Sequence, residues 1–406
     1  MPTNPSRPIP MLETADAAAT DERRQQLDLL RSSAASFVAK ESPTSRARAL
    51  RGKAPGFDLA FWSALAGQGW TGLLAPETAG GYGQGLAEMA EVAGALAAQA
   101  TPEPLLPVVA FAGRLLEGCS GSELARRLLA ELAAGSSLPA VAWQEDATGE
   151  GAFGKNGELS DPATVCARGQ GTLSLSGGKQ HVRPGCAASG YIVTASSADG
   201  LALVWLPATT PGLRCEPVLL ADGSFSARLH LDRAGVPSDH LLASGNAALQ
   251  TLARAHDEAV VLVAAELCAL ARRMVEMTLD YLRTRKQFGK AIGSFQSLQH
   301  RAVDMHIQQQ LAAAVVAEAL AALDAGADGA ARALLTARAK ARCSDAALTI
   351  AKESVQLHGA IGFTDEHDLG LYLQRTLVLS AWLGNGAAQR RRYALLSRRA
   401  GEGAAA

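Results

Sequence analysis

Residues 283–300, RTRKQFGKAIGSFQSLQH, gather side chains of the kinds that bind ligands. The segment contains four Arg or Lys residues, three Gln residues and two Phe rings. The formal net charge of the whole chain is only -1, so this local excess of positive charge does not follow from composition. Arg and Lys form strong hydrogen bonds with anionic oxygens such as those of phosphates. The segment is therefore the first candidate for a binding site.

A purely structural explanation of this segment concerns Arg285 and Phe288. Cations are favoured at the carboxyl end of a helix, where they interact with the helix dipole and cap free carbonyl groups. In that case Arg285 caps its own helix and Phe288 fills the interior of a helical bundle. The two explanations are compatible, and both stay open at this point.

The composition favours a protein that acts on small molecules. Of the 406 residues, 48% are hydrophobic and 19% are charged. Because the charges nearly balance, neither nucleic acid nor an anionic membrane is expected as the main partner. The amino terminus, MPTNPSRPIP, has proline where a signal peptide has its apolar core, and no apolar run of about 20 residues lacks a charge. We therefore expect a cytoplasmic location and no membrane span.

The cysteines lie far apart in the sequence. They are Cys119, Cys166, Cys186, Cys215, Cys268 and Cys343. No CxxC pair occurs, and no histidine has the spacing typical of a zinc site. We therefore expect reduced thiols and no metal ion.

Residue patterns divide the chain into four parts. A proline-rich, flexible tail is expected over residues 1–19, and helices over 20–137, where Ala and Leu recur at helical spacing. Residues 138–245 contain short alternating stretches such as GTLSLSGGK and GYIVTASS, which predict the strands of a compact antiparallel domain. Over residues 246–406, long apolar stripes at i+3 and i+4 spacing predict a bundle of helices.

This order of parts, together with four short motifs, resembles the acyl-CoA dehydrogenase family. GWTGLLAPETAGGYGQG resembles the Gly-rich amino-terminal loop of the family, and LSGGKQHVRPGCAASGYIVTA resembles a segment of its β-domain. TRKQFGKAIGSFQSLQH resembles the turn between two bundle helices, and VQLHGAIGFTDEHDLGLYLQR resembles the carboxy-terminal flavin segment. The resemblance spans nearly the whole chain. It implies an α+β fold with an amino-terminal helical domain, a central small antiparallel β-domain and a carboxy-terminal helical bundle.

The resemblance implies FAD as the cofactor, bound between two subunits. Arg285, Gln287 and Phe288 match family positions that contact the flavin of a neighbouring subunit. Gln356 and Gly359 match positions where an amide and a bare backbone approach the pyrophosphate from the other side. A cofactor shared between chains implies an oligomer, either a homotetramer or a mixed tetramer.

The family reaction needs a carboxylate base that removes a proton from the carbon next to the thioester. The glutamate that serves as base in the most familiar members corresponds to Gly384 here, so the chain resembles a branch that lacks it. Other members carry the base about seven turns before the bundle arginine. That count reaches Ala259, one residue after Glu258, and we therefore predict Glu258 as the base. A purely structural role for Glu258 also stays open, because the helix dipole favours acidic residues in a first turn.

The β-domain departs from the family pattern as well. Where many relatives have Trp-x-Thr against the flavin, this chain has His181, Val182 and Arg183. Gln144 begins the stretch that corresponds to Thr-Glu-Pro. By resemblance, Gln144, His181 and Arg183 are predicted to contact the cofactor. A cation at Arg183 favours the anionic, reduced form of a flavin, unless Arg183 is a surface residue beside Pro184.

The resemblance predicts FAD-dependent α,β-dehydrogenation of an acyl-CoA thioester to the 2,3-enoyl-CoA in fatty acid or lipid catabolism. An electron-transfer flavoprotein or a similar protein is the implied electron acceptor. The carboxy-terminal segment resembles a branch that acts on bulky, cyclic or dicarboxylic CoA esters. Two alternatives remain: a non-catalytic partner subunit of a mixed acyl-CoA dehydrogenase tetramer, and a flavin oxidase or monooxygenase on the same scaffold.

Overall fold

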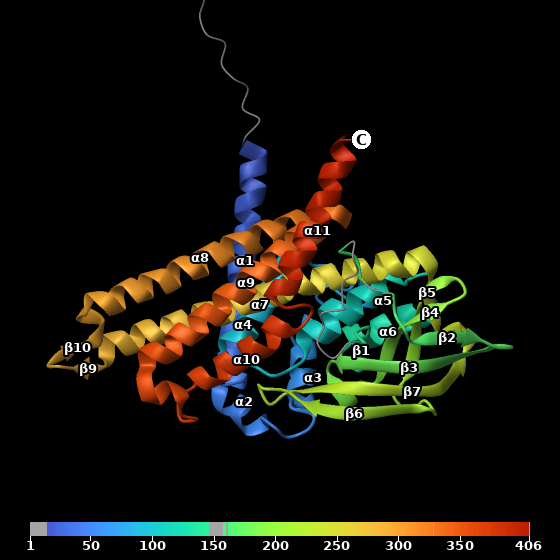
Figure 1. Ribbon diagram of the computed structural model, residues 1–406, viewed down its shortest axis with the longest axis horizontal. Helices are drawn as coiled ribbons and strands as arrows, with labels where there is room; N and C mark the ends of the chain where they lie inside the picture. The colour runs from blue at the N-terminus through green and yellow to red at the C-terminus, as the bar shows by residue number, and fades with distance from the viewer. Residues whose placement is uncertain (1–13, 146–156, 160, 328, 406) are drawn as a thin grey trace, which may run out of the picture.

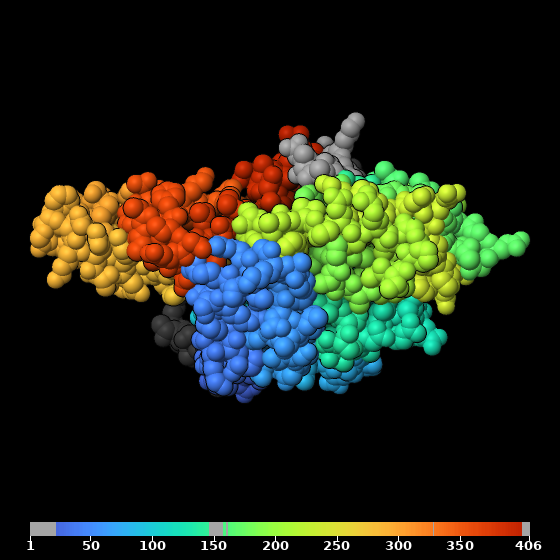
Figure 2. Space-filling model, turned by 90° about the horizontal axis from the view of Figure 1, so that it is seen from below, coloured from blue at the N-terminus to red at the C-terminus, as the bar shows by residue number. Residues whose placement is uncertain are grey.

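The computed structural model describes residues 14–145, 157–159, 161–327 and 329–405. Amino-terminal helices are followed by a central β-domain and a carboxy-terminal helical bundle. Figure 1 shows the β-domain at one end of an elongated molecule and the short hairpin of the bundle at the other. Seen from below, the amino-terminal helices lie between these two ends (Figure 2). The predicted α+β class and the order of its three parts are confirmed.

The amino-terminal helices pack against one another and against the bundle. The first of them begins at Thr14, inside the range predicted as a tail, because TADAAAT is rich in alanine, the residue with the highest helix propensity. The helices of this part are α1 (Thr14–Glu41), α2 (Thr44–Leu50), α3 (Leu59–Gly67), α4 (Leu86–Ala98), the π-helical η3 (Leu106–Gly113), α5 (Arg114–Gly118) and α6 (Glu123–Ala133).

The β-domain is built on a single sheet with the strand order β6-β7-β3-β2-β4-β5-β8, in which β1 also pairs with β4. Most neighbouring strands are antiparallel, as predicted, but β1 and β2 run parallel to β4. The pairing of β3 with β7 shifts register before Val182, where the chain leaves the sheet for the 3-10 turn η5 (Gly185–Ala187). The strands are β1 (Pro139–Ala142), β2 (Val165–Arg168), β3 (Thr172–Val182), β4 (Gly190–Ser197), β5 (Gly200–Pro207), β6 (Leu213–Leu219), β7 (Phe225–Pro237) and β8 (Leu241–Ser244).

The bundle is organised around its first helix, which packs against α4, the sheet and the later helices. The predicted apolar stripe of this helix is buried, including Val260, Val263, Leu267 and Met274. No helix among the described residues is long and apolar enough to cross a bilayer. The elements of the bundle are α7 (Gly245–Thr284), the hairpin strands β9 (Lys286–Gln287) and β10 (Lys290–Ala291), α8 (Gln296–Asp324), α9 (Gly329–His358), the 3-10 turn η8 (Gly359–Phe363), α10 (Leu369–Ala381) and α11 (Gly386–Ala405).

The expectation that all cysteines are reduced thiols is wrong for one pair. Cys186 in η5 and Cys215 in β6 form a disulfide, with their Cα atoms 5.9 Å apart. The two residues lie far apart in the sequence, and only the sheet topology places η5 beside β6. Cys119, Cys166, Cys268 and Cys343 are free thiols.

A buried cluster of charges ties three bundle helices together. The carboxylate of Asp257 on α7 lies 2.8 Å from a guanidinium nitrogen of Arg392 on α11 and 3.3 Å from one of Arg332 on α9. Burial disfavours the ionised carboxylate, but the charge of Arg392, the hydrogen bond and charge of His256 and the charge of Arg332 outweigh that effect and lower the pKa of Asp257 to about 2. The pairing is therefore part of what holds the carboxy-terminal helix against the bundle.

We expect Asp257→Asn to lower the free energy of unfolding by about 3–5 kcal/mol, because it leaves two guanidinium groups without their shared carboxylate. Denaturant unfolding at pH 7 measures the change. A matched control on the same helix is Asp280→Asn, which removes only an exposed ion pair with Arg283 and should change stability by less than about 1 kcal/mol.

The pH dependence of this effect follows from the lowered pKa of Asp257. A carboxyl group with a depressed folded-state pKa stabilises the fold fully above its unfolded pKa of about 3.9, and this contribution is lost as the pH falls toward 2. The stability difference between wild type and Asp257→Asn should stay constant from pH 7 to pH 5. Equal stabilities at pH 7 would show that the cluster does not hold the helices.

Candidate functional site

A cavity of ≈ 590 Å³ lies where the end of α7, the β9–β10 hairpin and the end of α9 meet, and we call it the turn cavity. Four predicted cofactor residues line it: Arg285 and Gln287 from the hairpin segment, and Gln356 and Gly359 from the end of α9. The two pairs lie far apart in the sequence. The fold therefore brings the predicted cation, amides and glycine into one place.

The end of α7 explains the position of Arg285. The helix stops at Thr284, and Arg285 takes an extended conformation while its backbone N–H donates to the carbonyl of Tyr281 at 2.9 Å. The chain then reverses at Phe288 and Gly289, both of which have a positive φ, of 52° and 80°. The Arg285 guanidinium makes no hydrogen bond or ion pair with the part of the chain that the structure describes, so its side chain does not cap α7 there.

Gly359 presents bare backbone to the turn cavity. Its φ is 64°, a conformation that residues with a side chain rarely adopt. A Cβ atom built at this position would meet no heavy atom within 4 Å. The backbone here borders open space, where a ligand could approach it closely.

Phe288 lies at the tip of the hairpin and is 89% exposed. Its ring lies edge-on to that of Phe295, with 6.1 Å between centroids. It therefore does not fill the interior of the bundle, the structural role considered for it. Phe363, in η8, is also largely exposed. Both rings thus lie on the surface of this chain.

A second cavity, of ≈ 310 Å³, lies between the sheet and α10, and we call it the β-domain cavity. Gln144, His181 and Arg183, the predicted cofactor residues of the β-domain, all line it. Its opposite wall is apolar and includes Leu377 and Trp382. The cavity thus combines polar groups on one side with a hydrophobic surface on the other.

Arg183 is buried, with 7% of its surface exposed, so the alternative of a surface residue is wrong. Its guanidinium lies over the ring of Trp382, 5.2 Å from the centroid, and donates to Ser224 Oγ at 3.1 Å. Burial, followed by the charge of Arg375, lowers the pKa of Arg183 to about 10. The group stays protonated at neutral pH and forms no ion pair with a described carboxylate.

Glu258, the predicted base, is buried and held by two arginines. Its Oε2 atom accepts from Arg114 Nε at 2.5 Å, and its Oε1 atom accepts from Arg254 Nε at 2.8 Å. Burial raises the pKa of the carboxyl group, but the hydrogen bonds and charges of Arg114 and Arg254 outweigh this and leave it below its ordinary value. Glu258 lines neither the turn cavity nor the β-domain cavity.

The chain just before Glu258 is packed tightly. The ring of His256 lies edge-on to Trp143, with 5.2 Å between centroids, and to Phe111, with 6.3 Å. These three rings fill the space between the start of the β-domain, η3 and α7. This packing fixes α7 next to Glu258, whose carboxylate is itself enclosed by the side chains of Arg114 and Arg254.

Gly384, the position that the resemblance assigns to the base, lies in the turn between α10 and α11 and has a φ of 92°. The buried ammonium group of Lys340, on α9, donates to the carbonyls of Ser380 (3.0 Å) and Gly384 (3.1 Å). Lys340 forms no ion pair with a described carboxylate, and burial lowers its pKa to about 7. A buried lysine thus holds the backbone of this turn.

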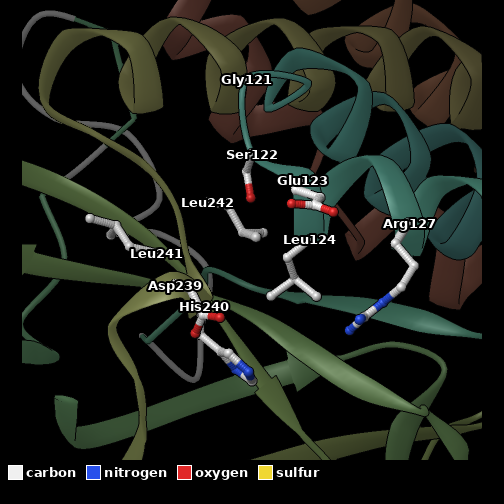
Figure 3. Close-up of a pocket in the computed structure, with 9 residues that line it drawn as sticks. All are labelled: Gly121, Ser122, Glu123, Leu124, Arg127, Asp239, His240, Leu241 and Leu242. Carbon is white, nitrogen blue, oxygen red and sulfur yellow. The ribbon is translucent and has the colours of Figure 1, made fainter. Parts of the chain in front are cut away.

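A third cavity, of ≈ 630 Å³, lies between the start of α6 and the turn that leads into β8 (Figure 3). Its charged and titratable side chains are Glu123, Arg127, Asp239 and His240, which give no excess of positive charge. None of the predicted site residues lines it. It is therefore a poorer match for an anionic cofactor than the turn cavity.

Two residues of the site region were not predicted from the sequence. Trp382 lies two positions before Gly384 in AWLGNG, so the count that located Gly384 could also have placed it at the site. Lys340 lies within a helix that contains other basic residues, and only its burial distinguishes it. Among the described residues, no group of His, Cys, Asp and Glu is arranged to hold a metal ion.

Residues 24–136 match the acyl-CoA dehydrogenase N-terminal domain, and residues 249–395 match the acyl-CoA dehydrogenase C-terminal domain. Acyl-CoA dehydrogenase IpdE2 of Mycobacterium tuberculosis is 31% identical to this chain over 352 residues, which cover 86% of this chain and 91% of the relative.

Two solved structures have the same architecture. The structure of the Tcur3481-Tcur3483 steroid ACAD variant aligns with a TM-score of 0.82 at 28% identity, over 94% of this chain and 99% of the other. The ChsE4-ChsE5 complex from Mycobacterium tuberculosis aligns with a TM-score of 0.80 over 93% and 97% of the two chains. At 23% identity, the second likeness shows the fold alone.

Proposed function

The chain belongs to the acyl-CoA dehydrogenase family and is an acyl-CoA dehydrogenase, and we propose that it works with FAD bound between two subunits. The observation that carries the proposal is that Arg285, Gln287, Gln356 and Gly359 line one cavity. A guanidinium with no partner among the described residues, two carboxamides and an open backbone position suit a pyrophosphate, which needs positive charge and several hydrogen-bond donors. The exposed ring of Phe288 gives the neighbouring subunit an aromatic surface to pack against.

The β-domain cavity supports the same proposal for the flavin ring. Trp382 and Leu377 offer apolar contacts, and Gln144, His181 and Arg183 offer hydrogen-bond donors. When bound, FAD accepts the hydride that leaves the substrate. Arg183 would place a positive charge beside the ring, and the apolar side chains of Leu377 and Trp382 would contact its face.

The substrate we propose is a bulky, ring-bearing acyl-CoA ester. The Tcur3481-Tcur3483 structure is described as a steroid ACAD, and its identity to this chain is 28% over nearly the whole length. An electron-transfer flavoprotein or a similar protein is the proposed electron acceptor, on family resemblance. Membership of the family argues against a flavin oxidase or monooxygenase on the same scaffold.

The source of the catalytic base separates two candidates. In the first, Glu258 removes the proton, which requires that Arg114 and Arg254 release its carboxylate. In the second, a homologous chain in a mixed tetramer supplies the base, while this chain completes the binding site for the cofactor. The two arginines on Glu258 and the glycine at position 384 favour the second candidate. The similar Tcur3481-Tcur3483 structure, whose name joins two proteins, also supports the second candidate.

We expect Arg285→Ala to weaken FAD binding by about 10- to 100-fold, since a charge-assisted hydrogen bond contributes about 1.5–3 kcal/mol. The oligomer should weaken with it, because the cofactor bridges two chains. Flavin absorbance per chain and native mass measurement test both effects. Arg283→Ala is the control, because Arg283 is exposed and paired with Asp280. Full flavin occupancy in Arg285→Ala would show that Arg285 does not bind the cofactor.

If Glu258 is the base, Glu258→Gln should slow anaerobic flavin reduction by acyl-CoA about 10²- to 10⁴-fold and leave flavin binding unchanged. Stopped-flow absorbance of the flavin measures the rate. Glu117→Gln is the matched control, since Glu117 pairs with the same Arg114. An unchanged rate in Glu258→Gln would assign the proton transfer to another residue or another chain.

If the base comes from a partner, this chain should form a mixed tetramer with a homologous acyl-CoA dehydrogenase chain and contain fewer flavins than chains. Co-expression with neighbouring homologous genes, native mass measurement and flavin counting test this composition. The contrary result is a tetramer formed by this chain alone, with one flavin in every chain that acyl-CoA reduces. That result would exclude the partner and would make Glu258 or a neighbouring residue the catalytic base.

A further inference from the structure

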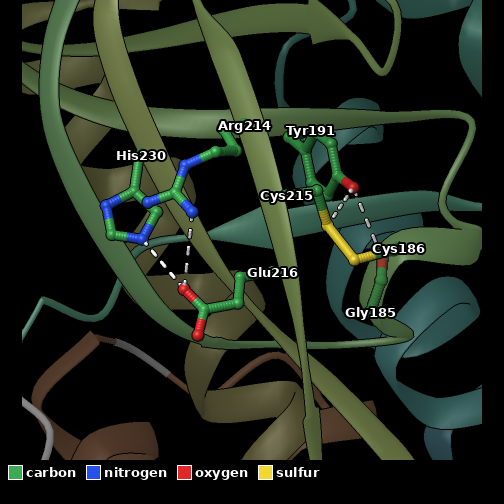
Figure 4. Close-up of a disulfide and its surroundings, with 7 residues drawn as sticks. All are labelled: Gly185, Cys186, Tyr191, Arg214, Cys215, Glu216 and His230. Atoms are coloured by element: carbon green, nitrogen blue, oxygen red, sulfur yellow. Dashed lines mark hydrogen bonds and ion pairs between the residues drawn. A yellow bond between two sulfur atoms is a disulfide. The ribbon is translucent and has the colours of Figure 1, made fainter.

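The Cys186–Cys215 disulfide lies in the β-domain, with the hydroxyl of Tyr191 beside it (Figure 4). Cys186 belongs to η5, directly after β3, and Cys215 lies in the middle of β6. Their Cα separation of 5.9 Å falls in the range usual for disulfides. The bond therefore links an irregular segment to a regular strand.

The two sulfur atoms have different surroundings. Cys186 is exposed to solvent, whereas Cys215 is half-buried and packs against the hydrophobic core of the β-domain. The hydroxyl of the buried Tyr191 lies 3.3 Å from Cys215 Sγ and 3.5 Å from the carbonyl oxygen of Gly185, and its single proton serves one of these two acceptors at a time. Burial raises the pKa of Tyr191 to about 12, so this hydroxyl keeps its proton at neutral pH. Cys186 is thus the more exposed cysteine of the pair, and Cys215 has a hydrogen-bond donor beside its sulfur.

We propose that Cys186–Cys215 is a thiol–disulfide exchange site that reacts at Cys186 with a low-molecular-weight thiol. The incoming thiolate forms a bond to Cys186 Sγ, and the Cys186–Cys215 bond breaks with its electron pair on Cys215 Sγ. The Tyr191 hydroxyl then hydrogen-bonds the Cys215 thiolate, which takes up a proton from solvent. A second thiol reduces the mixed disulfide, so that two small thiols become one small disulfide and the protein gains two thiols.

The other cysteines do not compete for the small thiol or its oxidised form. Cys119, Cys166 and Cys343 are buried, and Cys268 is partly buried. Burial raises the pKa of all four thiols, which keeps them protonated and therefore unreactive. Exchange is thus confined to one exposed sulfur of the chain.

The exchange has a consequence for the β-domain cavity. Arg183 lines that cavity and lies three positions before Cys186. Between them the chain has left the β3–β7 ladder, and the side chain of Arg183 contacts Ser224 and Trp382. Opening the disulfide removes the covalent link from this segment to β6. The cavity wall at Arg183 is therefore held more loosely in the reduced protein, whether or not a cofactor is bound.

The first experiment counts thiols and locates the attack on the full chain. The protein is oxidised with glutathione disulfide, denatured and alkylated, and four of the six cysteines should react before reduction and all six after it. The oxidised native protein is then given reduced glutathione for a short time. Peptide mass spectrometry should find the glutathione adduct on Cys186 at least about tenfold more often than on Cys215.

The second experiment tests the role of Tyr191. Loss of a hydrogen bond to a thiolate should slow exchange about tenfold in Tyr191→Phe. Tyr82→Phe is the control, because Tyr82 is exposed and lies in the amino-terminal part of the chain. Hydrogen exchange of the backbone amides at residues 183–189 should accelerate at least about tenfold on reduction, and that of β5 should not.

Each of these measurements can overturn the proposal. Six reactive cysteines in the oxidised protein would exclude the disulfide, and an adduct found mainly on Cys215 would reverse the direction of attack. An unchanged exchange rate in folded Tyr191→Phe would show that the Tyr191 hydroxyl does not stabilise Cys215 as the leaving group. Equal amide exchange at residues 183–189 in both redox states would show that the disulfide does not hold the cavity wall.

Discussion

The unbroken burial of helix α7 is the constraint on which both ends of the molecule depend. The helix runs from Gly245 to Thr284 and packs against α4, α9 and β5. At 1.5 Å per residue, Glu258 and Arg285 are held about 40 Å apart on one straight element. The chain cannot bring its own Arg285 turn to its own Glu258. We infer that a bound molecule contacted by both an Arg285 and a Glu258 must lie between two chains.

The acidic residues of α7 show what this burial requires. Glu258 binds Arg114 and Arg254, Asp257 is paired as described above, and Glu266 accepts from Arg375 at 2.8 Å. A buried carboxylate is tolerated only when its partners are complete, and removal of one partner is strongly destabilising. The arginines that make Asp257 and Glu258 acceptable inside the protein also lower the pKa of both groups and so make them weaker bases. Packing and proton transfer therefore compete for the same side chains.

The turn cavity was predictable from the sequence because its residues belong to two local motifs with fixed spacing around glycines. Other features depend on contacts between distant segments, which periodicity does not record. The Cys186–Cys215 bond requires η5 to lie beside β6, and the burial of Arg183 requires α10 to cover the end of β3. Lys340 is one of several basic residues in α9, and only the folded structure shows that it donates to the carbonyl of Gly384 in the α10–α11 turn.

The departures from the family pattern are not spread evenly over the molecule. The turn cavity contains the cation, amides and glycine that the resemblance predicts, and its guanidinium has no described partner. The two positions considered for the base differ from the family pattern: Gly384 has no carboxylate and its carbonyl accepts from Lys340, and Glu258 is bound by two arginines. Arg285, which has no partner among the described residues, and Phe288, which is 89% exposed, lie together at the hairpin. We infer that both serve a cofactor and a base that belong mainly to another subunit.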